Sequence, residues 1–197
     1  MSHHECPPDA DLSRRDALKL AVGVGAAVMI PLVPAEVAAA AQRAVARGKP
    51  VVLKFFTATQ HRTVDALTEV IIPTDERSPG ARAARVADYL DFVLNEAPAD
   101  ARQAWKDGLV ALDGASTSQF GKPFADLSPD QQVAIVTEAA RNEDSPTTPL
   151  ERFFAEVKGR TIHAYYTSEI GIHQDLEYKG NQFLPEFVGC VHPEHMA

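Results

Sequence analysis

Apolar residues in the body of this chain recur at helical spacing. Val64, Leu67 and Ile71, for example, lie three and four residues apart, which places them on one face of a helix. No sustained alternation typical of a strand is found, and the run VVLKFF at 51–56 is ambiguous. The pattern predicts an all-α fold, an orthogonal bundle of about five or six helices with an irregular C-terminal tail.

Caps, prolines and glycines mark where these helices begin and end. Thr57, with Gln60 three residues on, has the form of a capping box, and Ser128-Pro129 is a typical helix start. We therefore expect helices from Thr57 to Pro73, through Val86 to a stop before Pro98, through Trp105 to Gly114, from Ser128 onward, and from about Leu150 toward Ser168.

The composition is that of one globular domain. The chain has 197 residues, a hydrophobic fraction of 45% and a net charge of −8, whereas binding a phosphate backbone needs a basic surface. Its two cysteines cannot form a four-cysteine site, and no CxxCH haem motif is present. No GxSxG, phosphate-loop or HExxH motif occurs either. We therefore expect no nucleic-acid partner and no catalytic residues in this chain.

The N-terminus has the layout of an export signal. Arg14 and Arg15, flanked by Ser13, Leu18 and Lys19, precede a short apolar run. This is the layout of twin-arginine signals, which export proteins already folded. The run is shorter than the roughly 20 residues of a membrane-spanning helix. We therefore expect recognition by the twin-arginine translocase and a periplasmic location. The alternative is an amphipathic helix with an incidental arginine pair.

The predicted signal is followed by a helical domain and a tail of different character. Small residues at 37–41 offer sites for a signal peptidase. We therefore divide the chain into a signal at 1–41, a helical domain at 42–170 and a tail at 171–197. The tail lacks a sustained helical period, and it carries aromatic residues of a kind favoured at protein interfaces. It is expected to dock a partner.

Two blocks of residues resemble the gluconate 2-dehydrogenase subunit 3 family, the small subunit of membrane-associated, flavin-dependent sugar dehydrogenases. The first block consists of FTATQ at 56–60, the segment 67–73, PGA at 79–81 and VADY at 86–89. The second is Gly171 with DLEYKGN at 175–181, which has no generic structural explanation. With the export signal, the resemblance covers most of 12–190. Beyond Asn181 the chain departs from the family's Trp-containing segment and looks like the branch that accompanies glucoside 3-dehydrogenase-type large subunits.

The resemblance implies a non-catalytic subunit of an exported complex. The large subunit of such complexes binds FAD and oxidises a sugar hydroxyl, and a cytochrome or another acceptor removes the electrons. The small subunit often carries the export signal for both, so FAD is expected in the partner and not in this chain. The complex would lie in the periplasm, attached to the inner membrane. The expected interface residues are Asp175, Glu177, Tyr178, Gly180, Asn181, Phe183, Phe187 and Cys190.

The tail also permits other interpretations. Cys190, His192 and His195 form a Cys-x-His-x-x-His pattern that could bind zinc, iron or copper. The chain would then be a stand-alone periplasmic metal- or haem-binding protein. Cys190 could instead pair with a cysteine of the large subunit. Asp175 and Glu177 could form an acid–base pair, although a turn accounts better for their sequence context.

Overall fold

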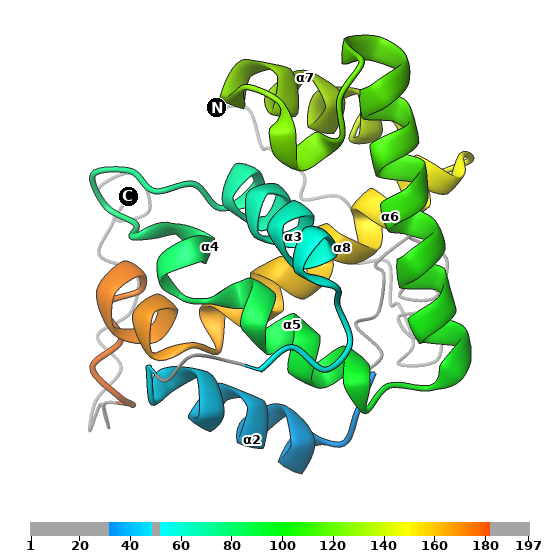
Figure 1. Cartoon of the computed structure of the whole chain (residues 1–197). Helices are drawn as coiled ribbons and strands as arrows, with labels where there is room; N and C mark the ends of the chain where they lie inside the picture. The colour runs from blue at the N-terminus through cyan, green and yellow to red at the C-terminus, as the bar shows by residue number, and fades with distance from the viewer. Residues whose placement is uncertain (1–31, 49–51, 182–197) are drawn as a thin grey trace, which may run out of the picture.

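The computed structural model describes residues 32–48 and 52–181, which fold into a bundle of helices (Figure 1). The helices are α2 (Ala35–Ala46), α3 (Ala58–Ile71), α4 (Gly80–Ala83), α5 (Val86–Asn95), α6 (Ala99–Phe120), η1 (Phe124–Asp126), α7 (Pro129–Ala139), α8 (Pro149–Tyr166) and η2 (Gly171–Asp175). No strand occurs within these two stretches. The expected all-α fold is therefore confirmed.

Side-chain caps begin three of the helices. The Thr57 hydroxyl accepts a hydrogen bond from the Gln60 main-chain N–H at 3.2 Å, and the Gln60 side chain accepts one from the Thr57 N–H at 3.0 Å. Ser128 caps α7 in the same way, so both expected helix starts are confirmed. A third capping box, formed by Thr148 and Glu151 at the start of α8, was not predicted. Main-chain donors at Thr148 and Thr147 lower the pKa of Glu151 to about 2.

Helix α6 is longer than the sequence predicted. Gly114 was expected to end it, but the helix continues to Phe120. Gly114 is exposed and lies in open space, so its lack of a side chain costs only about 1 kcal/mol of helix propensity. The helix ends instead at Gly121, whose positive φ of 73° gives the left-handed C-terminal conformation that favours glycine.

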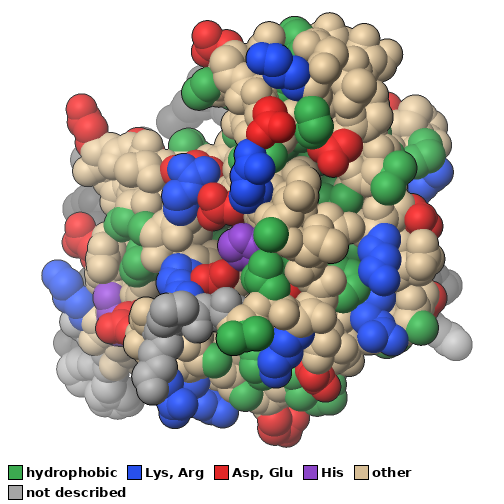
Figure 2. Space-filling model, viewed as in Figure 1, with side chains coloured by type: hydrophobic (Ala, Val, Ile, Leu, Met, Phe, Trp, Pro, Cys, Tyr) green, Lys and Arg blue, Asp and Glu red, His purple; other side chains and the backbone are tan. Residues whose placement is uncertain are grey.

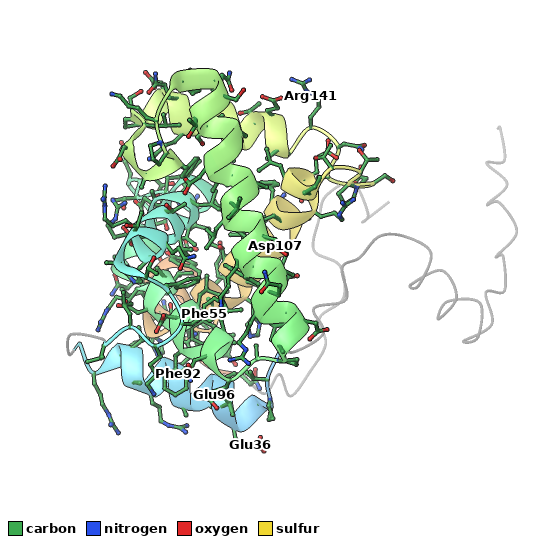
Figure 3. All side chains as sticks on the ribbon, turned by 45° about the vertical axis from the view of Figure 1, so that its right-hand side comes forward. Glu36, Phe55, Phe92, Glu96, Asp107 and Arg141 are labelled. Carbon is green, nitrogen blue, oxygen red and sulfur yellow. The ribbon has the colours of Figure 1, made fainter. Side chains whose placement is uncertain are left out.

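The hydrophobic core lies around α3, which contacts α4, α5, η1, α7 and α8. Trp105 of α6 is almost fully buried between Phe56 and Phe153, with ring centroids 6.1 and 5.6 Å away. Figure 1 shows α3 and α8 crossing in the middle of the bundle, with α2 along one side and α6 along another. Side chains fill the space between these helices (Figure 3).

The ambiguous run at 51–56 is neither strand nor helix where the structure describes it, at 52–56. It is held by Asp91 of α5, which is 1% exposed. The Asp91 carboxylate accepts main-chain N–H bonds from Lys54, Phe55 and Phe56 at 2.9, 3.0 and 2.8 Å. Its buried charge is thus paired with three donors, as a buried carboxylate requires.

Helix α2 was not predicted, and it lies across the expected signal boundary at residue 41. It packs on α5, with Ala41 and Val45 buried. Glu36, on the opposite side, points away from the bundle (Figure 3). None of the helices described is long and apolar enough to cross a membrane.

Candidate partner-binding surface

The segment that follows α8 is fixed to the end of that helix by a close main-chain approach. A Cβ atom placed on Gly171 would lie 2.1 Å from the Tyr165 carbonyl oxygen, so only glycine fits there. The Ser168 hydroxyl donates to the same carbonyl at 2.6 Å and accepts from the Gly171 N–H at 3.0 Å. The predicted irregular tail therefore begins with one ordered π-helical turn, η2.

The second family-like block follows this turn on the surface. Asp175 ends η2, and its carboxylate beside the Tyr166 hydroxyl raises the pKa of Tyr166. The Tyr178 main-chain N–H donates to the Ile172 carbonyl at 3.0 Å. Its hydroxyl donates to the Asn181 side-chain oxygen at 2.7 Å. These bonds give residues 175–181 a defined path.

The backbone of this block supports the turn interpretation of Asp175 and Glu177. Glu177 has a positive φ of 48° and Gly180 one of 93°, and such left-handed residues reverse the chain direction. Glu177 is exposed, whereas Asp175 is engaged by Tyr166. A shared acid–base role for the two carboxylates has no geometric support in this arrangement.

Four exposed apolar side chains occur on the end of α8 and in the segment after it. Ile162 and Tyr166 lie one turn apart on α8, and are 41% and 38% exposed. Leu176 and Tyr178 follow Asp175, the residue bound by Tyr166, and are 56% and 50% exposed. We call these four residues the α8–tail surface. Aromatic and aliphatic side chains held in fixed positions at the surface are typical of protein interfaces.

The loop before α4, which directly precedes PGA of the first family-like block, reaches the same helix. The Ser78 hydroxyl lies 2.7 Å from the Tyr165 hydroxyl in a buried contact, and it accepts the Gly80 N–H at 3.2 Å. Gly80 has a φ of 80°, and a Cβ there would lie 2.6 Å from the Thr74 hydroxyl oxygen. Tyr165 therefore contacts Gly171 of the second block through its carbonyl and, through its hydroxyl, Ser78, the residue next to PGA of the first block.

A charged cluster that the sequence analysis missed joins α3 and α5. His61 Nε2 lies 2.8 Å from one Asp88 oxygen, and Arg85 Nε lies 2.7 Å from the other. The hydrogen bond to Asp88 raises the pKa of His61 against the opposing effect of burial. Burial favours a higher pKa for Asp88, but the hydrogen bonds from His61 and Arg85 outweigh it and lower that pKa. Asp88 lies within the first family-like block, and this was the sequence feature that could have pointed to the cluster.

This cluster binds the helices together rather than exposing a reactive group. Arg85 also donates from Nη1 to the Val45 carbonyl of α2 at 3.0 Å. It does so from a left-handed conformation, with φ at 55°, which is strained for a residue other than glycine. Both oxygens of Asp88 are engaged, so the arrangement serves helix packing.

Several predicted residues lie outside the described part of the chain. These are the export-signal residues Ser13, Arg14, Arg15, Leu18 and Lys19, the interface residues Phe183, Phe187 and Cys190, and the metal candidates Cys190, His192 and His195. Within residues 32–48 and 52–181, no three metal-binding side chains come together. On the face shown in Figure 2, acidic and basic side chains are interspersed rather than gathered in a basic patch.

Comparison with known protein families shows to which family the chain belongs. The sequence profile of the family described as gluconate 2-dehydrogenase subunit 3 matches residues 58–185. The chain belongs to the gluconate 2-dehydrogenase subunit 3 family. No curated protein and no solved structure matches the chain. Membership in the gluconate 2-dehydrogenase subunit 3 family makes the chain a small subunit that associates with a dehydrogenase large subunit. The matched range begins at α3 and includes the whole α8–tail surface.

Proposed function

We propose that this chain is the non-catalytic small subunit of an exported, FAD-dependent sugar dehydrogenase. In this proposal it supplies the twin-arginine signal for the complex and stabilises the flavin-binding large subunit. The observation that carries the proposal is the α8–tail surface. Its apolar side chains are exposed in a segment that hydrogen bonds and a close glycine contact hold in place.

The geometry suits a subunit that is bound permanently. Tyr165 and Ser168 fix the tail to α8 before any partner arrives, so little conformational entropy is lost on docking. A permanent interface buries more than about 2,000 Å², which is more than four side chains provide. We therefore expect Phe183, Phe187 and neighbouring parts of α8 to contribute as well.

The chemistry is assigned to the partner. The sequence has no glycine-rich phosphate loop. In the His61–Asp88 pair, the second carboxylate oxygen of Asp88 binds Arg85. In this proposal, as the family resemblance implies, FAD and the sugar site belong to the large subunit, and a cytochrome or another acceptor takes the electrons. The residues of this chain bind, orient and escort that subunit.

The export role follows from the N-terminal arginines. Twin-arginine transport moves folded proteins, so a flavin loaded in the cytoplasm can cross within its protein. One signal on a tightly bound small subunit is then enough for both chains. Replacing Arg14 and Arg15 by lysine should leave both subunits in the cytoplasm. Dehydrogenase activity that persists in the periplasm would refute this role.

Co-purification tests the interface. A tagged chain purified from its own host should retain a flavin-containing large subunit, detected by flavin absorbance and by mass. The double variant Leu176→Ser/Tyr178→Ser should lose most of that flavin. Val110→Ser is the matched control, because Val110 of α6 is 71% exposed but lies outside the α8–tail surface. Equal flavin recovery with both variants would contradict the proposed interface.

A further inference from the structure

Helix α2 is built into the hydrophobic core although the sequence marks it as the end of a signal. Ala41 is fully buried, and Val33 and Val45 are each 6% exposed. Leu32, Val37 and Ala38 pack partly buried against the same core. The apolar contacts of this segment thus begin before the alanine run and continue through it.

Polar contacts tie the same helix to two other parts of the bundle. The Gln42 side chain donates to the Ala164 carbonyl and to the Thr167 hydroxyl, both at 2.9 Å, at the end of α8. Arg85, at the start of α5, donates to the Val45 carbonyl at 3.0 Å. Both contacts involve residues distant in sequence, so α2 is held by the tertiary fold rather than by its own helix propensity.

A peptidase needs an exposed, extended segment, and buried helical residues become accessible only through local unfolding. The stretch VAAAA at 37–41, which contains the alanine run, lies inside α2. A cut there would also remove Val33 and the first helical turn from the core. Because twin-arginine transport delivers a folded chain, α2 is already packed when a signal peptidase would act.

We propose that α2 is a permanent element of the folded domain and that the alanine run is not a processing site. The exported chain then keeps residues 33–46, and any removal of the signal occurs before Val33. The proposal rests on the export role given above. Ala38 and Ala41 then serve to pack α2 in the fold, although the small side chains of the alanine run also match a signal-peptidase site. The first residue of the mature chain is thereby restricted to 1–33.

The N-terminus of the exported protein tests this directly. The complex is purified from the periplasmic fraction, and the small subunit is measured by intact-mass spectrometry and N-terminal sequencing. The expected chain begins at or before Val33. A chain that begins at any residue after Val33 would overturn the proposal, and its presence in the periplasm would leave the export role intact.

A comparison of thermal stability on the full-length chain tests whether α2 is part of the folded domain, and this test does not require export. Ala41→Glu places a charge in the core and should lower Tm by about 6 °C or more, whereas Ala39→Glu, on the exposed side of α2, should change it by about 2 °C or less. Val45→Ala is the milder variant and should lower Tm by about 3 °C. Equal Tm values for wild type, Ala41→Glu and Val45→Ala would show that α2 is not part of the fold. Absence of the chain from the periplasm would contradict the export role alone.

Discussion

Asp91 shows how one side chain can determine the path of a segment that has no regular structure. Its buried carboxylate takes three consecutive main-chain donors from residues 54–56, which orients Phe56 toward Trp105. The sequence run there was ambiguous. The outcome depends on a carboxylate some 35 residues away in the chain, and no local pattern contains that information.

We expect substitution of Asp91 to be costly. Asp91→Ala leaves three main-chain donors without an acceptor and should lower the free energy of unfolding by about 3 kcal/mol or more. Asp91→Asn keeps one acceptor oxygen and should cost less. Chemical denaturation measures both values. An alanine variant as stable as wild type would show that water satisfies these donors.

The His61–Asp88 pair should make stability depend on pH. The pKa of His61 is raised above 6.5, so its contribution is complete below pH 6.5 and is lost as pH rises through the raised value. The pKa of Asp88 is lowered below 3.8, so its contribution is complete above pH 3.8 and is lost as pH falls through the lowered value. The pair therefore contributes most to the stability of the folded protein between pH 3.8 and pH 6.5.

Denaturation at about pH 6 and about pH 8 tests this window. Wild type should lose stability at the higher pH, and His61→Gln should remove that component of the loss. His163→Gln is the control, because burial lowers the pKa of His163 and its contribution has the opposite sign. An unchanged pH profile in His61→Gln would show that the pair does not contribute to stability.

At the scale of elements, helix starts were predictable and helix extents were not. The hydroxyls of Thr57 and Ser128 accept hydrogen bonds from main-chain amides three residues away. The local sequence is therefore enough to predict where these two helices start. Gly114 was interpreted as a stop although its position is exposed and the helix tolerates it. Helix α2 was missed because alanine and valine suit an export signal as well as a packed helix. Tertiary contacts determine whether such segments form helices and where these helices end.

The two glycines inside α6 should respond to alanine in opposite ways. A Cβ on Gly108 would lie 2.0 Å from the Phe153 ring, whereas one on Gly114 meets nothing within 4 Å. Gly108→Ala should therefore destabilise the protein by about 1–3 kcal/mol, and Gly114→Ala should stabilise it by about 0.5–1 kcal/mol. Thermal denaturation compares them. A Gly108→Ala variant as stable as wild type would mean that α6 and α8 can separate without cost, whereas a destabilised Gly114→Ala would contradict the open site at Gly114.

At the scale of the molecule, Tyr165 links the second family-like block to the loop that directly precedes PGA of the first. Its hydroxyl contacts Ser78, and its carbonyl lies against Gly171. The sequence predicted both blocks and a partner-binding tail. The fold places residues 175–181 on the exterior as a segment with its own hydrogen bonds, and binding of a partner there stays a prediction. Ser78 and Tyr165 lie 87 positions apart in the chain, so their contact could not be inferred from either block alone.

Gly171→Ala tests whether this connection positions the tail. The added methyl group would displace η2 from the Tyr165 carbonyl, so the bundle should remain folded while flavin recovery with the tagged chain falls several-fold. Gly114→Ala is the control, since its site is open. Circular dichroism verifies folding of both. Full flavin recovery with Gly171→Ala would show that the partner does not need the tail in this position.

The α8–tail surface has a consequence for how a cell makes this protein. A chain produced without its companion would present Ile162, Tyr166, Leu176 and Tyr178 to water and to other copies of itself, and exposed apolar patches promote aggregation. Synthesis of the two subunits in matched amounts, close together in time and place, would keep that surface covered from the outset.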